Sequence, residues 1–180
     1  MRVITGKARG VQLKTPEGML TRPTADRVKE ALFSIINFDI PMASVLDLFG
    51  GTGQLGIEAL SRGANSAVFV DQREDACKII RENLRRTKLE SQSRVVRSDY
   101  LDYLRRSKEK FDIILLDPPY AEVFLENALK CITEIDILKS DGIIVAERPV
   151  EKDLPFEFEG FTRSKDYKYG KTLLTIYRKD

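Results

Sequence analysis

Residues 44–56 read SVLDLFGGTGQLG, an apolar segment that runs into a glycine-rich turn. Gly51, Gly53 and Gly56 have the spacing G-x-G-x-x-G, and Asp71 follows Gly53 by 18 residues. Glycines in this spacing allow a tight turn and let a ligand approach backbone N–H groups at the start of the next helix. The stretch therefore predicts the first strand and helix of an α/β sheet that binds a nucleotide-like ligand.

The segments on both sides repeat this alternation of strand and helix. Strands are predicted at 44–49, 66–71, 93–99, 111–117, 142–148, 161–169 and 171–179, and helices at 21–36, 53–62, 73–89, 100–107 and 122–135. Apolar strands alternating with helices indicate a mostly parallel sheet covered on both faces. We expect a doubly wound α/β domain at 41–180 with an antiparallel last strand, preceded by a small basic hairpin and helix extension at 1–40.

The composition limits the chemistry. The 180 residues include no histidine and two cysteines, Cys77 and Cys131. Ser-His-Asp hydrolysis, Cys-His catalysis and histidine-bearing metal sites are therefore excluded, and both cysteines lie in apolar helical patterns typical of buried, reduced thiols. No apolar run approaches the ~20 residues of a membrane span, and the N-terminus lacks the apolar region of a secretory signal. We expect a cytoplasmic protein that works without a metal.

Positive charge is concentrated near the N-terminus. Residues 1–29 carry a net charge of +5, whereas the remaining 151 residues sum to −3. The basic side chains of this segment are Arg2, Lys7, Arg9, Lys14, Arg22, Arg27 and Lys29. Such asymmetry is typical of a surface for an anionic polymer such as nucleic acid, although a merely solvated basic surface would give the same count.

Aspartates mark the ends of four successive predicted strands, at Asp47, Asp71, Asp99 and Asp117. In doubly wound sheets, ligands bind at the carboxyl ends of the strands near the point where the strand order reverses. Clustered carboxylates repel one another and need partners. Their gathering at one edge therefore predicts a binding site.

The positions of these carboxylates suggest which ligand binds. A carboxylate at Asp47 would oppose a pyrophosphate but suits a cationic group, such as the ammonium of an amino acid. Asp71 could accept two ribose hydroxyls, and Asp99 could accept from an adenine amino group. S-adenosylmethionine has all three groups and fits better than NAD, whose domains often begin with the first strand rather than more than forty residues before it.

Residues 113–120, IILLDPPY, end the fourth strand beside the first. Pro118 and Pro119 stiffen the backbone and lack N–H donors, so the Asp117 carboxylate and the Pro118 carbonyl can converge on one exocyclic NH₂ group. Tyr120 can stack on a base, worth ~1–3 kcal/mol. The amine lone pair would then face a sulfonium methyl group. The predicted reaction is an in-line methyl transfer, catalysed by positioning and electrostatics.

Taken together, these motifs resemble the RsmD family of bacterial 16S rRNA (guanine-N2)-methyltransferases along essentially the whole chain. The matching stretches are RVITGKARGVQL, TRPTADRVKEALFSII, VLDLFGGTGQLGIEALSRGA, VFVDQ, DIILLDPPY and YGKTLLTIY. The RPT-plus-helix block and GGTGQLGIEALSRGA are the more family-specific pair, since many amino-methyltransferases share DPPY. The resemblance implies a Rossmann-like class I methyltransferase fold, S-adenosylmethionine as donor, and methylation of one guanine N2 in 16S rRNA, in an assembled or partly assembled small subunit.

The resemblance also assigns roles by position. Its implied amine site is Asp117, Pro118, Pro119 and Tyr120, and its implied cofactor site is Asp47, Gly51, Gly53, Asp71 and Asp99. Arg22 and Thr24 would lie near the methionine end of the cofactor or near the target base. Lys7, Arg9 and Arg27 would face RNA phosphates.

Three alternatives remain open from the residues alone. Any planar NH₂ group fits the DPPY site, so the substrate could be adenine N6 in DNA or an amide in a protein. A non-catalytic RNA-binding assembly factor could keep the same fold. An NAD-dependent dehydrogenase would share the glycine-rich turn.

Overall fold

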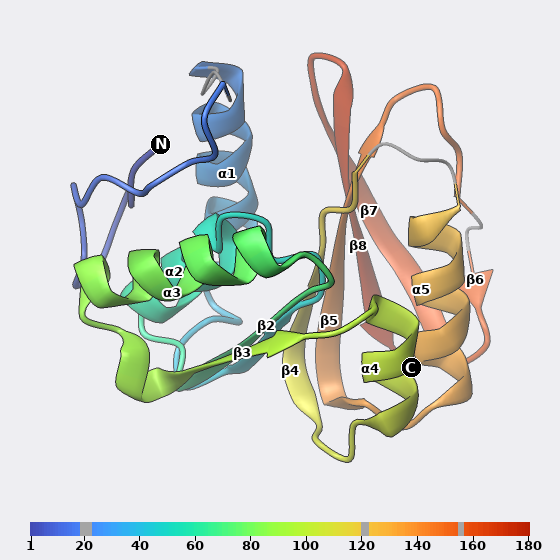
Figure 1. Ribbon diagram of the computed structural model, residues 1–180. Coiled ribbons are helices and arrows are strands. Elements are labelled where there is room, and N and C mark those ends of the chain that lie inside the picture. The colour runs from blue at the N-terminus through green and yellow to red at the C-terminus, as the bar shows by residue number, and fades with distance from the viewer. Residues whose placement is uncertain (19–22, 120–122, 155–156) are drawn as a thin grey trace.

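The computed structural model of the chain describes residues 1–18, 23–119, 123–154 and 157–180. Its strands form a single eight-stranded sheet (Figure 1). The strands are β1 (Ser44–Asp47), β2 (Ser66–Asp71), β3 (Ser93–Arg97), β4 (Phe111–Leu116), β5 (Leu138–Pro149), β6 (Glu157–Phe158), β7 (Phe161–Tyr169) and β8 (Thr172–Lys179). Their order is β3-β2-β1-β4-β5-β8-β7-β6. Strands β1 to β5 pair in parallel and β8, β7 and β6 pair antiparallel. The predicted doubly wound, mostly parallel sheet with an antiparallel end is confirmed.

Helices cover both faces of the sheet (Figure 1). The helices α1 (Pro23–Ile35), α2 (Gln54–Ser61) and α3 (Glu74–Thr87) pack on one face, and α4 (Tyr100–Arg106) and α5 (Phe124–Glu134) pack on the other. Side chains alternate between faces along each strand. Val45 of β1, Ile113 of β4 and Val145 of β5 accordingly join the core beneath α1 to α3. The same alternation fixes where the side chains at the strand ends point.

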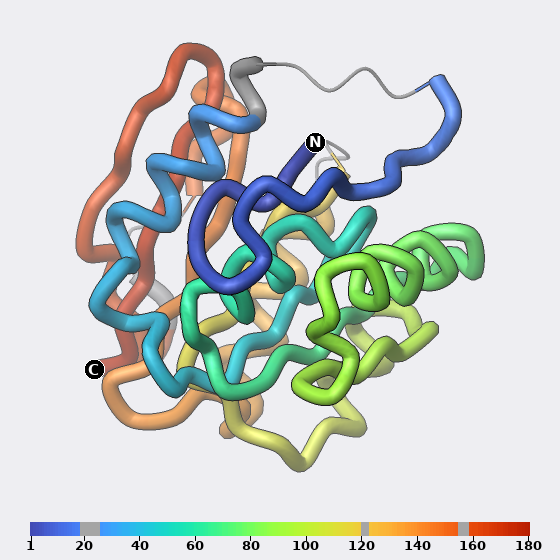
Figure 2. Tube along the Cα trace, turned by 90° about the vertical axis from the view of Figure 1, so that its left-hand side faces the viewer, coloured from blue at the N-terminus to red at the C-terminus, as the bar shows by residue number. Residues whose placement is uncertain are grey.

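The N-terminal segment folds against α2 and α3. Its predicted hairpin has one antiparallel bridge among the described residues, between Arg2 and Gln12. Three backbone hydrogen bonds join its two sides: Val3 N to the Val11 carbonyl (3.0 Å), Gly10 N to the Val3 carbonyl (2.9 Å) and Leu13 N to the Met1 carbonyl (3.0 Å). Val3 and Leu13 are buried in the same core as the helices of this face. In Figure 2 the dark blue N-terminal trace accordingly lies against these helices. The described residues among the first 40 therefore share a core with the sheet.

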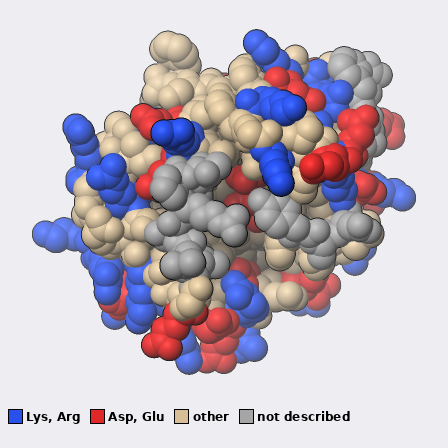
Figure 3. Space-filling view, turned by 90° about the horizontal axis from the view of Figure 1, so that it is seen from above, with Lys and Arg blue, Asp and Glu red and all other residues tan. Residues whose placement is uncertain are grey.

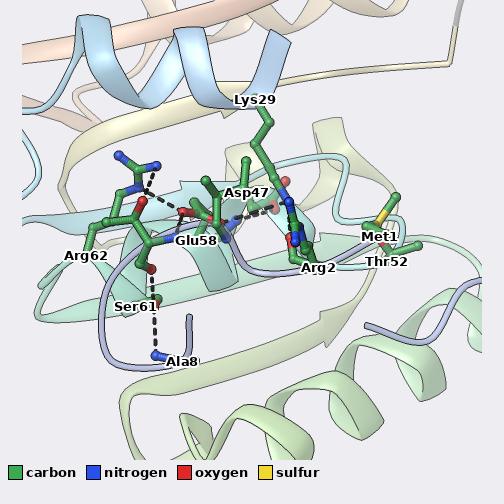
Figure 4. A network of polar contacts seen from close by, with 12 residues as sticks. Met1, Arg2, Ala8, Lys29, Asp47, Thr52, Glu58, Ser61 and Arg62 are labelled. Atoms are coloured by element: carbon green, nitrogen blue, oxygen red, sulfur yellow. Dashed lines mark hydrogen bonds and ion pairs between the residues drawn. The ribbon is translucent and has the colours of Figure 1, made fainter. Parts of the chain in front are cut away.

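A buried carboxylate fixes this segment in place (Figure 4). Glu58 of α2 is fully buried and accepts hydrogen bonds from the backbone N–H groups of Ile4 (2.8 Å) and Thr5 (3.0 Å). Arg62 Nε donates to the same carboxylate at 2.8 Å, and Lys29 Nζ lies 3.9 Å from it. The Lys29 ammonium also donates to the carbonyl of residue 2 at 2.7 Å. Lys29 is therefore a buried structural cation, and counting it among the surface charges of the basic segment is wrong.

Two short elements escape the sequence patterns: the 3₁₀ turn Glu90–Gln92 and the two-residue strand β6. Neither is long enough to show a hydrophobic period. The predicted buried, free thiols at Cys77 and Cys131 are confirmed. Among the described residues, no helix is long and apolar enough to cross a membrane.

Candidate active site at the carboxyl edge of the sheet

A cavity of about 470 Å³ lies where β1, β2 and β4 end. Its walls include Asp47 and Asp117 from the strand ends, and Met1 and Pro16 from the N-terminal segment. Its volume is that of a typical small-molecule site. Seen from above in Figure 3, acidic side chains lie within a central hollow, and lysines and arginines stand around it. The structure thus gathers three of the four predicted strand-end carboxylates, Asp47, Asp71 and Asp117, in one cavity.

The glycine-rich turn forms one wall of this cavity. Gly51 has a φ of 57°, and a Cβ built on it would meet no atom nearer than 3.8 Å, so its backbone is open to a ligand. Gly53 does not line the cavity; its φ is 80°, and a Cβ there would press to 3.2 Å against Ile80. Gly56 lets α2 pack on the sheet, because a Cβ there would lie 2.3 Å from the Phe69 ring. Only the first glycine of the motif faces the ligand space.

Asp47 is 2% exposed and points toward α2, where it accepts a hydrogen bond from Gly56 N at 3.0 Å. The pKa of this carboxyl is raised to about 8, chiefly by burial; the Gly56 bond opposes the rise, and the charges of Asp117 and Asp71 add to it. A cationic ligand group would offset this loss of hydration and favour the ionised form. This is the behaviour expected of a residue that binds an ammonium.

Asp71 and Asp99 have different surroundings. Asp71 lines the cavity and accepts from Gly51 N (3.0 Å) and Arg73 N (2.9 Å), which leaves lone pairs for ribose hydroxyls. Asp99 does not line the cavity: its Oδ1 accepts from Leu101 N (2.8 Å) as the N-cap of α4. Its neighbours Ser98 and Tyr100 line the cavity instead. An apolar wall of the cavity is formed by Phe49, Tyr100 and Phe124. The ring centroids of Phe49 and Tyr100 are 5.1 Å apart, and those of Tyr100 and Phe124 are 5.5 Å apart.

A second, smaller cavity of about 280 Å³ adjoins the first. Gln54, Leu55, Asp117 and Pro119 line both cavities. The remaining walls of the small cavity are Lys29, Pro118 and Glu147. Asp117 therefore stands at the junction of a large space and a small one.

Glu147 is a site residue that the sequence analysis missed. Leu116 of β4 pairs with Ala146 of β5, so Asp117 and Glu147 are the next neighbours along these parallel strands. Burial raises the pKa of both carboxyls, and the charge of Asp117 raises that of Glu147 further. The predicted strand 142–148 does carry this glutamate near its end, so extending the strand-end rule from aspartate to glutamate would have found it.

Gln54 is the second missed residue. Its Oε1 is buried without a hydrogen-bond partner among the described residues, although the residue faces both cavities. Buried polar atoms in native proteins nearly always have partners, so this oxygen is placed for a donor on a ligand. The Gln54 oxygen, the Asp47 carboxylate and the open backbone at Gly51 together fit a ligand that carries an ammonium group and a sugar. The residues present therefore suit S-adenosylmethionine.

Three of the remaining predicted residues, Lys7, Arg9 and Arg27, do not line either cavity. These three residues are exposed on the N-terminal segment and α1. Thr24 belongs to α1, which begins at Pro23. Arg22 and Tyr120 lie outside the described residues, so their predicted roles stay predictions.

The chain is similar to known proteins along its whole length. The family model described as Conserved hypothetical protein 95 matches residues 1–178. YlbH from Bacillus subtilis is 40% identical, and the match covers 99% of each chain. Ribosomal RNA small subunit methyltransferase D from Haemophilus influenzae is 34% identical over 99% of this chain and 93% of that one. The solved structure of yhhF from Escherichia coli is 29% identical with a TM-score of 0.90, covering 100% of this chain and 98% of that one.

Proposed function

Because the chain belongs to the RsmD family, whose model is described as Conserved hypothetical protein 95, we propose that it methylates the N2 amine of one guanine in 16S rRNA. The methyl donor is S-adenosylmethionine, and the substrate is an assembled or partly assembled small ribosomal subunit in the cytoplasm. One observation carries the proposal: Asp117 stands where the large cavity meets the small one. An amine held by Asp117 is thereby presented to a donor in the large cavity.

S-adenosylmethionine supplies an electrophilic methyl group on a sulfonium. Asp47 holds the ammonium of the donor, and Asp71 accepts from its ribose hydroxyls. The backbone at Gly51 lets the donor lie close to the turn. These contacts position the methyl group without a metal or a histidine, so catalysis depends on orientation and on fixed charges.

The small cavity holds the target base. The Asp117 carboxylate and the Pro118 carbonyl accept the two N–H groups of the amine, which directs its lone pair toward the methyl group. Burial raises the pKa of Asp117, so its Oδ atoms can take up the proton that the amine loses after transfer. A base stacked within a duplex or helix junction has to be turned out of its stack to reach this position.

The exposed basic residues of the N-terminal segment, Lys7 and Arg9, and Arg27 on α1 form the proposed RNA surface. Their side chains provide sequence-independent attraction to phosphates. Arg22 and Thr24 are proposed to lie close to the donor or the base.

Methyl transfer from tritiated S-adenosylmethionine tests the proposal directly. The substrates are small ribosomal subunits from a strain that lacks this protein, naked 16S rRNA, DNA and a total protein fraction. We expect label in the 16S rRNA of the subunits, recovered as N2-methylguanosine after digestion. Label in DNA, in N6-methyladenosine or in a protein amide would contradict the guanine assignment. Absence of binding to S-adenosylmethionine in calorimetry would favour a non-catalytic assembly factor.

A further inference from the structure

The small cavity contains two carboxylates that lie side by side. β4 and β5 are parallel, with Ile114 opposite Ile144 and Leu116 opposite Ala146. Because neighbouring strands of a sheet lie ~4.8 Å apart, Asp117 and Glu147 follow at the same spacing. Both strand-end side chains face α1 to α3, since they have the parity of Leu115 and Val145 in that core. The cavity therefore presents two adjacent acceptors.

Two adjacent acceptors distinguish among bases. On the Watson–Crick edge of guanine, the N2 amine lies beside the N1–H group, so two neighbouring positions donate. On adenine the N6 amine lies beside N1, and on cytosine the N4 amine lies beside N3; in both, the second position is an acceptor. Enzymes that act on an unstacked base read this edge by hydrogen bonds. The two adjacent acceptors in the small cavity therefore match the two adjacent donors of guanine, and they do not match adenine or cytosine.

We propose that Glu147 selects guanine as the target base, by accepting the hydrogen bond from N1–H while Asp117 accepts from the N2 amine. This inference rests on the proposed methyltransferase function and adds a specificity-determining residue to it. An adenine placed with its amine at Asp117 would turn the N1 lone pair toward the Glu147 carboxylate. When Glu147 is ionised, two acceptors would then face each other with no proton between them, which is unfavourable.

The charge state of this pair depends on the ligand, because a protonated carboxyl can donate and only the ionised form is purely an acceptor. Burial raises the pKa of Glu147, and so does the neighbouring charge of Asp117. Lys29, the other titratable residue in the wall, has its ammonium bound to the carbonyl of residue 2. The two N–H donors of guanine stabilise both carboxylates in the ionised form. The base itself thus supplies a hydrogen-bond donor to each carboxylate.

The other polar wall residue does not discriminate in this way. Gln54 carries a side-chain amide, which can present either its oxygen or its NH₂ group to a ligand. An ionised carboxylate only accepts. Replacing Glu147 by glutamine should therefore keep the shape of the cavity and remove the discrimination.

The test compares Glu147→Gln with Glu151→Gln, the same substitution at an exposed residue four positions along the chain. The nucleotide methylated by the unmodified protein is first located in 16S rRNA by mass spectrometry. Small subunits are then prepared with guanine or adenine at that nucleotide. Methyl transfer to each is measured as kcat/KM, with S-adenosylmethionine affinity measured by calorimetry as a check on folding.

We expect Glu147→Gln to reduce the preference for guanine over adenine by about tenfold or more, the discrimination that one good base contact provides. Glu151→Gln should keep the preference and the rate. An unchanged preference in Glu147→Gln, with normal S-adenosylmethionine affinity, would overturn the role of Glu147 and leave the proposed function standing. Methylation of an adenine by the unmodified protein would overturn both.

Glu147→Asp keeps the test decisive if the glutamine variant does not fold. A shorter carboxylate still only accepts, so we expect a lower kcat/KM with the preference for guanine retained. Loss of the preference in Glu147→Asp at normal S-adenosylmethionine affinity would contradict selection by the carboxylate.

Discussion

Two groups of buried or half-buried charges lie on the α1–α3 face of the sheet, and they differ in their partners. Glu58 has a full set: two backbone N–H groups, the Arg62 guanidinium and the nearby Lys29 ammonium. A buried ion that is matched in this way holds structure together, because its hydrogen bonds replace the water it has lost. In this protein it fixes the N-terminal segment to α2.

The second group consists of Asp47, Asp117 and Glu147, and it is not matched. Among the described residues, no ion pair involves any of the three. The charge of Asp117 instead raises the pKa of both neighbours. Uncompensated carboxylates in a cavity indicate a site that ligands complete. The contrast separates residues that stabilise the fold from residues that bind.

Removing the matched carboxylate should have the largest effect. Glu58→Ala leaves the Lys29 ammonium buried beside no carboxylate and two backbone N–H groups without their acceptor. We expect unfolding in urea to show a loss of about 3–5 kcal/mol, the range for breaking a buried ion pair. Glu30→Ala, on the exposed side of α1, should change stability by less than about 0.5 kcal/mol. A loss below about 1 kcal/mol for Glu58→Ala would mean that the cluster is not structural.

Removing an unmatched carboxylate should act on turnover instead. Asp117→Ala deletes the acceptor that positions the amine, and we expect kcat to fall by about 10²–10³. Affinity for S-adenosylmethionine, measured by calorimetry, should change only a few-fold, because Asp117 is assigned to the substrate amine. Losses of equal size in affinity and in turnover would place Asp117 in cofactor binding.

Asp47→Asn tests whether an unmatched carboxylate destabilises the free protein. The folded-state pKa of Asp47 is about 8, above the ordinary value near 3.9, so the folded state binds the proton more tightly. Stability should therefore fall as pH rises from about 4 to 8. Asparagine keeps an acceptor for Gly56 N and removes this penalty, so at pH 8 it should stabilise the ligand-free protein by on the order of 2 kcal/mol.

Thermal unfolding at pH 5.5 and 8 checks this sign. The pH dependence should be shallower in Asp47→Asn, although Asp117 and Glu147 still contribute to it in the same direction. The same variant should lose affinity for S-adenosylmethionine, since the ammonium loses its counter-ion. Lower stability of the variant at pH 8 would show that Asp47 already has a stabilising partner.

The sequence predicted most of the fold because the longer strands and helices carry apolar patterns of their own, which the 3₁₀ turn and β6 are too short to show. It predicted Asp47, Asp71 and Asp117 because strand ends in a parallel sheet share one edge. It could not show which carboxylates have partners, since Glu58 reads as one acidic residue in a helix. Counting Lys29 as a surface charge overlooks Leu32, Phe33 and Ile36, which lie three, four and seven residues after it on a buried stripe that continues one residue past α1.

Glycine substitutions test how closely the matched group holds the N-terminal segment. Gly6 has a φ of 90°, and a Cβ there would lie 1.8 Å from the Ser61 carbonyl oxygen. Gly10 has a similar φ of 84°, with nothing within 4 Å of a built Cβ. Alanine at either position carries the strain of positive φ, but only Gly6→Ala also clashes with α2. We expect Gly6→Ala to be less stable than Gly10→Ala by about 1–3 kcal/mol in chemical denaturation. Equal stabilities would show that the loop can move off α2 without loss.

Exposed charges on the docked segment should have the smallest effect. Arg9 lies in the loop that Glu58 and Ser61 hold against α2, and its side chain is exposed. If it contacts an RNA phosphate, Arg9→Glu should weaken binding to small subunits and flatten the plot of log affinity against log salt by about 1. Lys108→Glu carries the same charge reversal on the exposed loop between α4 and β4, outside the N-terminal segment and α1, and should leave the slope unchanged. A slope that flattens equally in both variants would reflect net charge alone, whereas an effect confined to Arg9 would make the loop fixed by Glu58 part of the RNA surface.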